Sequence, residues 1–299
     1  MFKGAIVAIV TPFKKGRVDE DALRSLIEMQ INNGTDGIVP CGTTGESATL
    51  SHKEHDRVIE ITIEAVKKRV PVIAGTGSNS TAEALRLTRH AYEAGADGVL
   101  MVTPYYNKPT QEGMYQHFQM IAEQVPIPVI LYNVPGRTGA NLLPETVLRL
   151  ASVPNIVGIK EASGSIKQIM DVIHLCPDDF CVFSGDDAMA LPVLAMGGRG
   201  VISVFSNIAP ADMAAMIDAY QAGDIVNARN MHYRMLPLMD ALFIETNPIP
   251  AKAALAMMGM IDYELRLPLC RMSKSNEEKL EKILCAYGLL TKSRMGNLC

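Results

Sequence analysis

The phrases Gly34-Thr35-Asp36-Gly37 and Gly95-Ala96-Asp97-Gly98 each lie between a stretch with helical spacing and a short apolar run. In each phrase the first glycine can end a helix, and the following residues return the chain to a strand. The same alternation extends over about the first 220 residues. Apolar runs predict strands at residues 4–10, 37–40, 70–75, 98–103, 128–133, 156–160, 181–184 and 200–203.

Helical spacing fills the intervals between these strands. Ser51 and Glu54 form a capping box at the start of one helix. The predicted helices span residues 19–33, 51–68, 81–94, 111–124, 144–151, 165–175, 186–196 and 209–222. Eight strand–helix units predict an α/β fold, the parallel (β/α)8 TIM barrel. An open doubly wound sheet is the alternative, but Gly42-Thr43-Thr44-Gly45-Glu46 lacks the glycine spacing of a dinucleotide or phosphate loop.

The strand pattern stops after Gly223, and three more helices are predicted at residues 224–244, 250–260 and 275–287. We therefore expect a catalytic barrel over residues 1–223 and a C-terminal helical appendage over residues 224–299. The Met- and Leu-rich faces of the appendage can pack on the barrel or on another subunit.

Composition excludes several classes of function. The net charge of −4 and the absence of a basic cluster argue against a nucleic-acid partner. No stretch reaches the roughly 20 apolar residues that span a bilayer. The six cysteines show no paired short spacing, which is typical of a reducing compartment, so we expect a cytoplasmic protein. No His or Cys group has the spacing of a metal site.

Lys160 ends a short apolar strand that starts after Pro154. Alternation along the strand predicts two faces, one with Ile156, Gly158 and Lys160 and the other with Val157 and Ile159. Gly158 would leave space beneath the lysine. Scarce water there would lower the pKa of the amine and make it a nucleophile that forms a Schiff base with a carbonyl. Alternatively, Lys160 extends into solvent or pairs with Glu161.

The other strand ends of a barrel gather hydroxyl groups and few carboxylates, which suits imine chemistry on a keto acid better than hydrolysis by metals or paired acids. The loop of Thr43 and Thr44 can bind a carboxylate through successive N–H groups and two hydroxyls, or it is an ordinary glycine turn. Tyr132 has the parity of Ile130 and can transfer protons, or it is a structural tyrosine. Arg137 can bind a carboxylate with two hydrogen bonds, or it is a solvated loop residue.

Three ordered motifs together resemble one family. They are Gly42-Thr43-Thr44-Gly45-Glu46, Tyr132-Asn133-Val134-Pro135-Gly136-Arg137 and Val157-Gly158-Ile159-Lys160-Glu161-Ala162. They resemble the dihydrodipicolinate synthase branch of the pyruvate-dependent class I aldolases, and the similarity runs from residue 2 to about residue 290. The resemblance implies a (β/α)8 barrel with a C-terminal helical region, usually assembled as a homotetramer that is a dimer of dimers.

The resemblance also implies roles. Lys160 would form an imine with pyruvate, without a separate cofactor or metal, and Tyr132 would move protons through Thr43 to Tyr106 of a neighbouring subunit. Thr43 and Thr44 would bind the pyruvate carboxylate, and Arg137 would bind L-aspartate 4-semialdehyde. Positions that match the pyruvate pocket are Gly185 and Ile202. The product would be 4-hydroxy-tetrahydrodipicolinate, on the route to diaminopimelate and lysine.

Two other functions stay open. One is a retro-aldol lyase similar to N-acetylneuraminate lyase, although that branch lacks the Pro-Gly-Arg-Thr phrase that contains Arg137. The other is a non-catalytic barrel that binds an amino acid or keto acid.

Six positions match those that bind the inhibitor L-lysine in sensitive relatives, although a polar helix surface would explain them too: Ala48, His52, His55, Asn79, Glu83 and Tyr105.

Overall fold

The computed structural model describes residues 2–290; residue 1 and residues 291–299, which include Cys299, lie outside the described part. Its main strands are β1 (Gly4–Ala8), β4 (Gly37–Val39), β5 (Ile73–Gly75), β6 (Gly98–Val102), β7 (Val129–Asn133), β8 (Ile156–Glu161), β9 (Cys181–Ser184) and β10 (Gly200–Ser203). These eight strands form one sheet in the order β4-β1-β10-β9-β8-β7-β6-β5. A parallel bridge between Ile38 and Val72 joins its two edges. The predicted (β/α)8 barrel is confirmed, and the open sheet is wrong.

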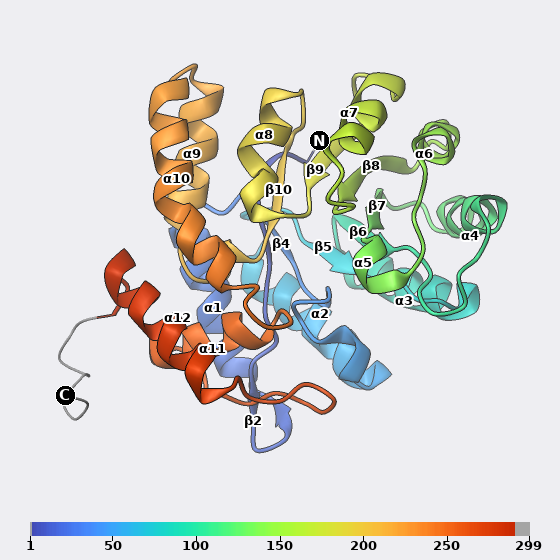
Figure 1. Ribbon diagram of the computed structural model, residues 1–299. Coiled ribbons are helices and arrows are strands. Elements are labelled where there is room, and N and C mark those ends of the chain that lie inside the picture. Colours follow the sequence, from blue (N-terminus) through green and yellow to red (C-terminus); the bar gives the residue numbers. More distant parts are fainter. Residues whose placement is uncertain (1, 291–299) are drawn as a thin grey trace.

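Helices surround the strands, as Figure 1 shows. They are α1 (Glu20–Asn32), α2 (His52–Val66), α3 (Thr81–Ala94), α4 (Gln111–Gln124), α6 (Pro144–Ala151), α7 (Ile166–Leu175), α8 (Ala190–Ala195) and α9 (Pro210–Gln221). The capping box of Ser51 and Glu54 is present at the start of α2. Each helix returns the chain so that successive strands run in the same direction, which brings their carboxyl ends to one end of the barrel.

The repeated phrase works in the same way twice. Gly34 and Gly95 adopt φ values of +81° and +93°, which L side chains rarely adopt, and each ends a helix. The carboxylate of Asp36 then accepts a hydrogen bond from the first half of β1 at 2.7 Å. The carboxylate of Asp97 accepts one from the residue before β5 at 2.9 Å. The aspartates therefore join each turn to an adjacent strand.

Several short elements differ from the prediction. A hairpin of β2 (Phe13–Lys14) and β3 (Arg17–Val18) follows β1, and a single helical turn, α5 (Pro135–Thr138), follows β7. The helix predicted at residues 186–196 is divided into η2 (Asp187–Met189) and α8. Elements of two to four residues are too short to show a hydrophobic period, so the sequence pattern could not reveal them.

A β-bulge between β7 and β8 changes the faces predicted for the start of β8. Ile156 and Gly158 pair with consecutive residues of β7, so Val157 is an extra residue. Ile156 packs with Ile159 in the layer between strands and helices, whereas Val157 packs against the barrel interior. The predicted faces of Ile156 and Val157 are wrong, because the extra residue reverses the alternation before Gly158.

Inward-facing side chains fill the barrel and exclude water from it. This inner cluster contains Ile6, Ala8, Val39, Ile73, Leu100, Ile130, Tyr132, Val134, Cys181, Phe183 and Ile202. Such layers make the barrel a packed core and not a pore, so polar groups at its carboxyl end lie on an apolar floor.

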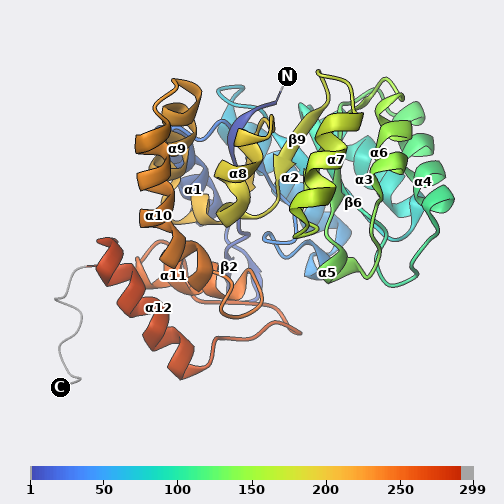
Figure 2. The ribbon, with the colours of Figure 1, turned by 45° about the horizontal axis from the view of Figure 1, so that its top comes forward.

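Three helices follow the barrel: α10 (Ile225–Ala241), α11 (Ile249–Met257) and α12 (Lys274–Tyr287). Figures 1 and 2 show α11 and α12 beside the end of the barrel that is farther from the N-terminus. Leu238, Leu255 and Leu284 of these helices share one buried cluster with the layer around the barrel. The boundary at residue 223 stays a prediction, and residues 291–299 of the appendage lie outside the described part. No helix within residues 2–290 is long and apolar enough to cross a membrane.

A buried ion pair joins the C-terminal helices to a barrel loop. Lys252 of α11 donates to Glu46 at 2.6 Å, and their side chains are 0% and 1% exposed. The same ammonium donates to the carbonyl of Thr11 at 2.9 Å, and its Nζ lies 4.1 Å from the centre of the Phe13 ring. The main-chain N–H of Arg266 donates to the second oxygen of Glu46 at 3.1 Å. Each charge therefore has partners that offset its loss of water.

Replacing Lys252 by alanine should destabilise the fold by about 3–5 kcal/mol, because Glu46 would become an unpaired buried charge. Urea unfolding at one fixed protein concentration measures the free energy of unfolding. Lys167→Ala is the matched control, because Lys167 pairs with Asp171 on the surface, where ion pairs contribute little. An equal decrease in the free energy of unfolding in the two variants would contradict the importance of the buried pair.

Candidate active site

Lys160 and Tyr132 are neighbours on adjacent strands at the carboxyl end of the barrel. They pair in register across β7 and β8, and the lysine Nζ lies 4.4 Å from the centre of the tyrosine ring. Both side chains are buried, with 5% and 7% exposure. Tyr132 packs with Ile130 in the inner cluster, as their shared parity predicted. The chain therefore places an amine against an aromatic face in a dry environment.

Burial controls the protonation of Lys160. Loss of water lowers its pKa to about 8, with the negative charge of Asp187 opposing this shift and the positive charge of Arg137 adding to it. A substantial neutral fraction is therefore present near pH 8. Burial also raises the pKa of Tyr132, against the effects of Arg137 and a hydrogen bond with Thr43. The phenol therefore keeps its proton in this range.

Asp187 is a buried acid that the sequence did not single out. It accepts hydrogen bonds from the Ser203 hydroxyl at 2.5 Å and from the N–H groups of Val204 at 3.1 Å and Phe205 at 2.9 Å. Burial raises its pKa to about 6, although these bonds favour the charged form. The aspartate is therefore mostly ionised at neutral pH and supports the ammonium form of Lys160.

Two glycines near Lys160 allow close packing of strands. A Cβ atom at Gly158 would lie 2.4 Å from the carbonyl oxygen of Cys181. Gly158 thus lets β8 approach β9, and the prediction that it leaves space beneath Lys160 is wrong. A Cβ atom at Gly185 would lie 2.6 Å from the Cβ atom of Ala162. Ile202 is fully buried in the inner cluster.

The loop that contains Thr43 and Thr44 follows β4. The N–H groups of Gly45 and Glu46 donate to carbonyls within the loop. The predicted run of successive free N–H groups is therefore wrong at these two positions, because the loop uses them to close its own turn. Thr44 is 2% exposed, and its hydroxyl oxygen accepts a hydrogen bond from the side chain of Asn247 at 3.0 Å.

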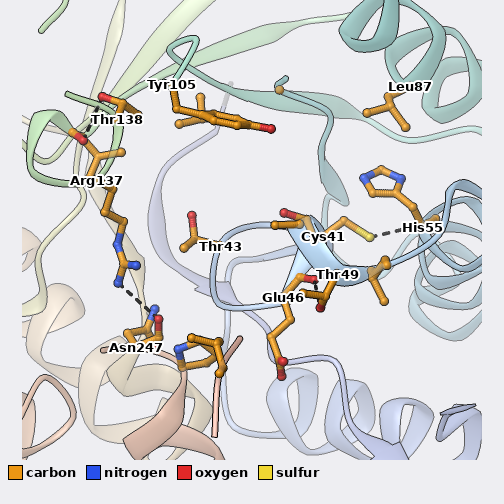
Figure 3. A pocket seen from close by; sticks show the side chains of 18 of the residues that line it. Cys41, Thr43, Glu46, Thr49, His55, Leu87, Tyr105, Arg137, Thr138 and Asn247 are labelled. Atoms are coloured by element: carbon orange, nitrogen blue, oxygen red, sulfur yellow. Dashed lines mark hydrogen bonds between the residues drawn. The ribbon is translucent and has the colours of Figure 1, made fainter. Parts of the chain in front are cut away.

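Arg137 extends from α5 toward a cavity of about 480 Å³. Figure 3 shows its guanidinium directed at Asn247, whose main-chain oxygen accepts a hydrogen bond from Nη2 at 3.3 Å. Thr43 also lines this cavity. Lys160 and Tyr132 do not line it, but Thr43 connects it to them through its bond with Tyr132. The described chain therefore brings Lys160, Tyr132, Thr43 and Arg137 to one region.

Tyr106 does not join this group within the described chain. Its side chain is 88% exposed, and its φ of +73° is unusual for a residue with a side chain. The N–H of Tyr106 donates to the carbonyl of Thr138. This main-chain hydrogen bond holds Tyr106 at the surface, where its side chain is exposed to solvent.

Most of the predicted effector residues line the same cavity. Of the six, Asn79 does not, and the others do: Ala48, His52, His55, Glu83 and Tyr105. His52 contacts Glu83 at 2.9 Å, and Asn79 donates to the carbonyl of Tyr105 at 3.1 Å. His55 is buried, and burial lowers its pKa to about 4, so it is neutral and bonds the carbonyl of Gly75.

A model of the dihydrodipicolinate synthetase family matches residues 1–287. The chain belongs to this family. It is therefore a lyase of the Schiff-base-forming class I aldolase type that serves lysine and diaminopimelate biosynthesis. Within residues 2–290, no group of three or more His, Cys, Asp or Glu side chains is placed to hold a metal ion.

Known relatives cover almost the whole chain. The chain is 71% identical over 290 residues to 4-hydroxy-tetrahydrodipicolinate synthase of Syntrophus aciditrophicus, covering 97% of this chain and 100% of that protein. A chloride-inhibited dihydrodipicolinate synthase from Acinetobacter baumannii, complexed with pyruvate, is 48% identical with a TM-score of 0.95, covering 97% and 100%. The enzyme from Cyanidioschyzon merolae with lysine bound is 44% identical with a TM-score of 0.94, covering 97% and 99%.

Sequence reasoning missed two residues of this region, Asp187 and Asn247. Asp187 lay inside the helix predicted at residues 186–196. The sequence pattern did not reveal that residues 187–189 form a separate short helix, η2, before α8. Asn247 lay in Asn247-Pro248-Ile249-Pro250, which indicated only a break between helices. A polar residue directly before a proline-rich break was the one available signal, and it does not reveal a partner 203 positions away.

Replacing Asp187 by asparagine should lower the pKa of Lys160, because the removed charge stabilises the ammonium form. Reductive methylation of Lys160, followed by peptide mass spectrometry across a pH series, should therefore begin at lower pH. Asp186→Asn is the matched control, because Asp186 is exposed and should shift the profile less. An unchanged or higher pKa in Asp187→Asn would contradict this assignment.

Proposed function

We propose that this chain is a 4-hydroxy-tetrahydrodipicolinate synthase that condenses pyruvate with L-aspartate 4-semialdehyde through an imine on Lys160. One observation carries the proposal: a buried amine with a pKa of about 8 lies against the Tyr132 ring. A neutral amine attacks a keto group, whereas an ammonium ion cannot. The pyruvate-bound relative supports the choice of keto acid.

The chemistry needs no separate cofactor. Lys160 adds to the keto carbon of pyruvate, and loss of water gives an imine. Loss of a methyl proton then gives an enamine, whose carbon attacks the aldehyde carbon of the second substrate. Tyr132 is suited to deliver a proton, because its raised pKa keeps the phenol protonated at rest. The phenolate left after that delivery is a base that can take a proton back.

The proton route and the assembly belong together in this proposal. Thr43 bonds Tyr132 and lines the cavity, so it can pass a proton outward. The exposed Tyr106 would complete the route in a neighbouring subunit of a homotetramer. Its 88% exposure in the single chain supports a contact outside that chain.

The carboxylates of the substrates are assigned to different groups. Thr43 and Thr44 bind the pyruvate carboxylate, and Gly185 and Ile202 line the pyruvate pocket. Arg137 binds the carboxylate of the semialdehyde, because its guanidinium lies at the cavity and pairs with no carboxylate among the described residues. This arginine favours the synthase over a retro-aldol lyase, which has no second carboxylate substrate of this kind.

Borohydride treatment with pyruvate should add a stable pyruvate-derived mass to Lys160 and to no other lysine. Lys160→Ala should give no adduct. Arg137→Ala should still give the adduct but should lose at least about tenfold in kcat/KM for the semialdehyde, because one charge-assisted contact contributes about 1.5–3 kcal/mol. A coupled assay with both substrates measures that loss.

Arg149→Ala is the matched control, since Arg149 pairs with Glu112 on the surface. An unmodified Lys160 after trapping would overturn the proposed function. Release of pyruvate from a sugar-derived keto acid, without turnover of the semialdehyde, would assign the chain to the lyase branch instead.

We also propose that L-lysine inhibits this enzyme at the predicted effector residues. Ala48, His52 and Glu83 share the cavity with Thr43, so a ligand there can influence the catalytic loop. The carboxylate of Glu83 is suited to an ammonium group, and its hydrogen bonds with Ser78 and His52 lower its pKa and keep it charged. The lysine-bound relative supports this choice of effector.

Millimolar L-lysine should slow the coupled reaction. Glu83→Gln should raise the half-inhibitory concentration at least about tenfold, because the contact to the ammonium loses its charge. Glu93→Gln, an exposed position on the same helix, should leave the inhibition unchanged. A parent rate that stays constant up to millimolar lysine would contradict the proposal.

The proposed location is the cytoplasm. Cys41, Cys176, Cys181, Cys270 and Cys285 are free thiols in the described chain. Free thiols persist in reducing compartments, which supports this location.

A further inference from the structure

Asn247 contacts both groups to which the proposed function assigns substrate carboxylates. It belongs to the segment between α10 and α11 and is only 4% exposed. Its side-chain Nδ2 donates to the hydroxyl of Thr44 at 3.0 Å. Its main-chain oxygen accepts from Arg137 at 3.3 Å. One residue of the C-terminal region therefore touches the threonine loop and the arginine through two different chemical groups.

The bond to Thr44 sets the direction of a hydroxyl. A hydroxyl has one hydrogen to donate, and its oxygen can accept. Because the Thr44 oxygen accepts from the Asn247 amide, its own hydrogen is available to point elsewhere. A carboxylate can only accept hydrogen bonds, so it needs this hydrogen. The asparagine amide thus keeps Thr44 in the donor orientation that an anion requires.

The other atom of the amide shows that this orientation has a cost. The Oδ1 atom of Asn247 is buried and has no hydrogen-bond partner in the described chain. An unsatisfied buried acceptor destabilises the folded state, because it has lost its hydrogen bonds with water. Such atoms are rare in folded proteins and call for an explanation. Orientation of Thr44 for an anionic substrate supplies one.

The position of Asn247 is held by the buried ion pair. Lys252 lies one helical turn beyond the start of α11 and bonds Glu46, which is two residues from Thr44 in the same loop. The asparagine and the threonine are therefore carried by two segments that a second, stronger contact holds together. This arrangement keeps the amide at hydrogen-bond distance without help from the substrate.

We propose that Asn247 is a positioning residue, whose side chain presents the Thr44 hydroxyl to the pyruvate carboxylate and whose main-chain carbonyl holds Arg137. This inference rests on the proposed function. It also separates two effects: a change of the side chain removes the bond to Thr44 but keeps the carbonyl for Arg137. Asn247→Ala should therefore weaken the binding of pyruvate and leave the binding of the semialdehyde unchanged.

The experiment is a double-mutant cycle of Asn247→Ala and Thr44→Val. The readouts are the pyruvate concentration for half-maximal borohydride trapping on Lys160 and the KM of each substrate. Asn247→Ala should raise the pyruvate values about tenfold, with kcat within about threefold and the semialdehyde KM unchanged. In the Thr44→Val background, Asn247→Ala should have no further effect, because the residue acts through that hydroxyl.

Asn247→Asp is a second variant of almost the same volume, and its carboxylate can only accept the Thr44 hydrogen. Asn247→Asp should weaken pyruvate binding more than Asn247→Ala does. Its effect should be larger in the Thr44 parent than in the Thr44→Val background. Asn227→Ala and Asn227→Asp, at an exposed position of α10, are the matched controls and should bind pyruvate like the parent. Thermal unfolding checks that each variant is folded.

Additive losses in the cycle, or pyruvate binding by Asn247→Asp equal to that of the parent, would overturn the inference. A raised semialdehyde KM with unchanged pyruvate binding in Asn247→Ala would overturn it too. Failure of the parent to trap pyruvate would instead overturn the proposed function. The two failures are therefore distinct.

Discussion

The buried ion pair of Glu46 and Lys252 is the contact on which the site depends. It joins the loop after β4 to α11, across 206 positions of the chain. A pair with 0% and 1% exposed side chains is stable only when both charges have further partners. The carbonyl of Thr11, the N–H of Arg266 and the Phe13 ring supply them. The hairpin, the loop and the C-terminal helices are thereby fixed as one unit around the barrel mouth.

That unit matters because the barrel alone does not complete the site. The strands supply Lys160 and Tyr132 in register, and the inner cluster keeps water away from them. The groups suited to bind anions lie outside the barrel core, on the loop and on α5. Asn247, which belongs to the C-terminal region, contacts both. The pKa of Lys160 also depends on residues outside the strands, because Asp187 raises it and Arg137 lowers it.

Much of this molecule could be predicted from local patterns. The repeated glycine–aspartate phrase, the alternation of strand and helix and the capping box of Ser51 all act within one turn or one strand, so they are visible in sequence. The bulge at Val157 was not, because it depends on which residue of β7 each residue of β8 faces. Gly158 was misinterpreted for the same reason, since its contact is the Cys181 carbonyl of the next strand.

The sequence by itself determined the barrel, its order of elements, the three motifs that resemble the family and the lysine with a strand before it. Periodicity and turn chemistry are properties of neighbouring residues, so a single chain is enough to read them. Only the tertiary structure decided the pKa of Lys160, the partner of Glu46 and the contacts of Asn247. Burial and charge depend on residues far apart in sequence, and only folding determines which of them lie within a few ångströms of one another.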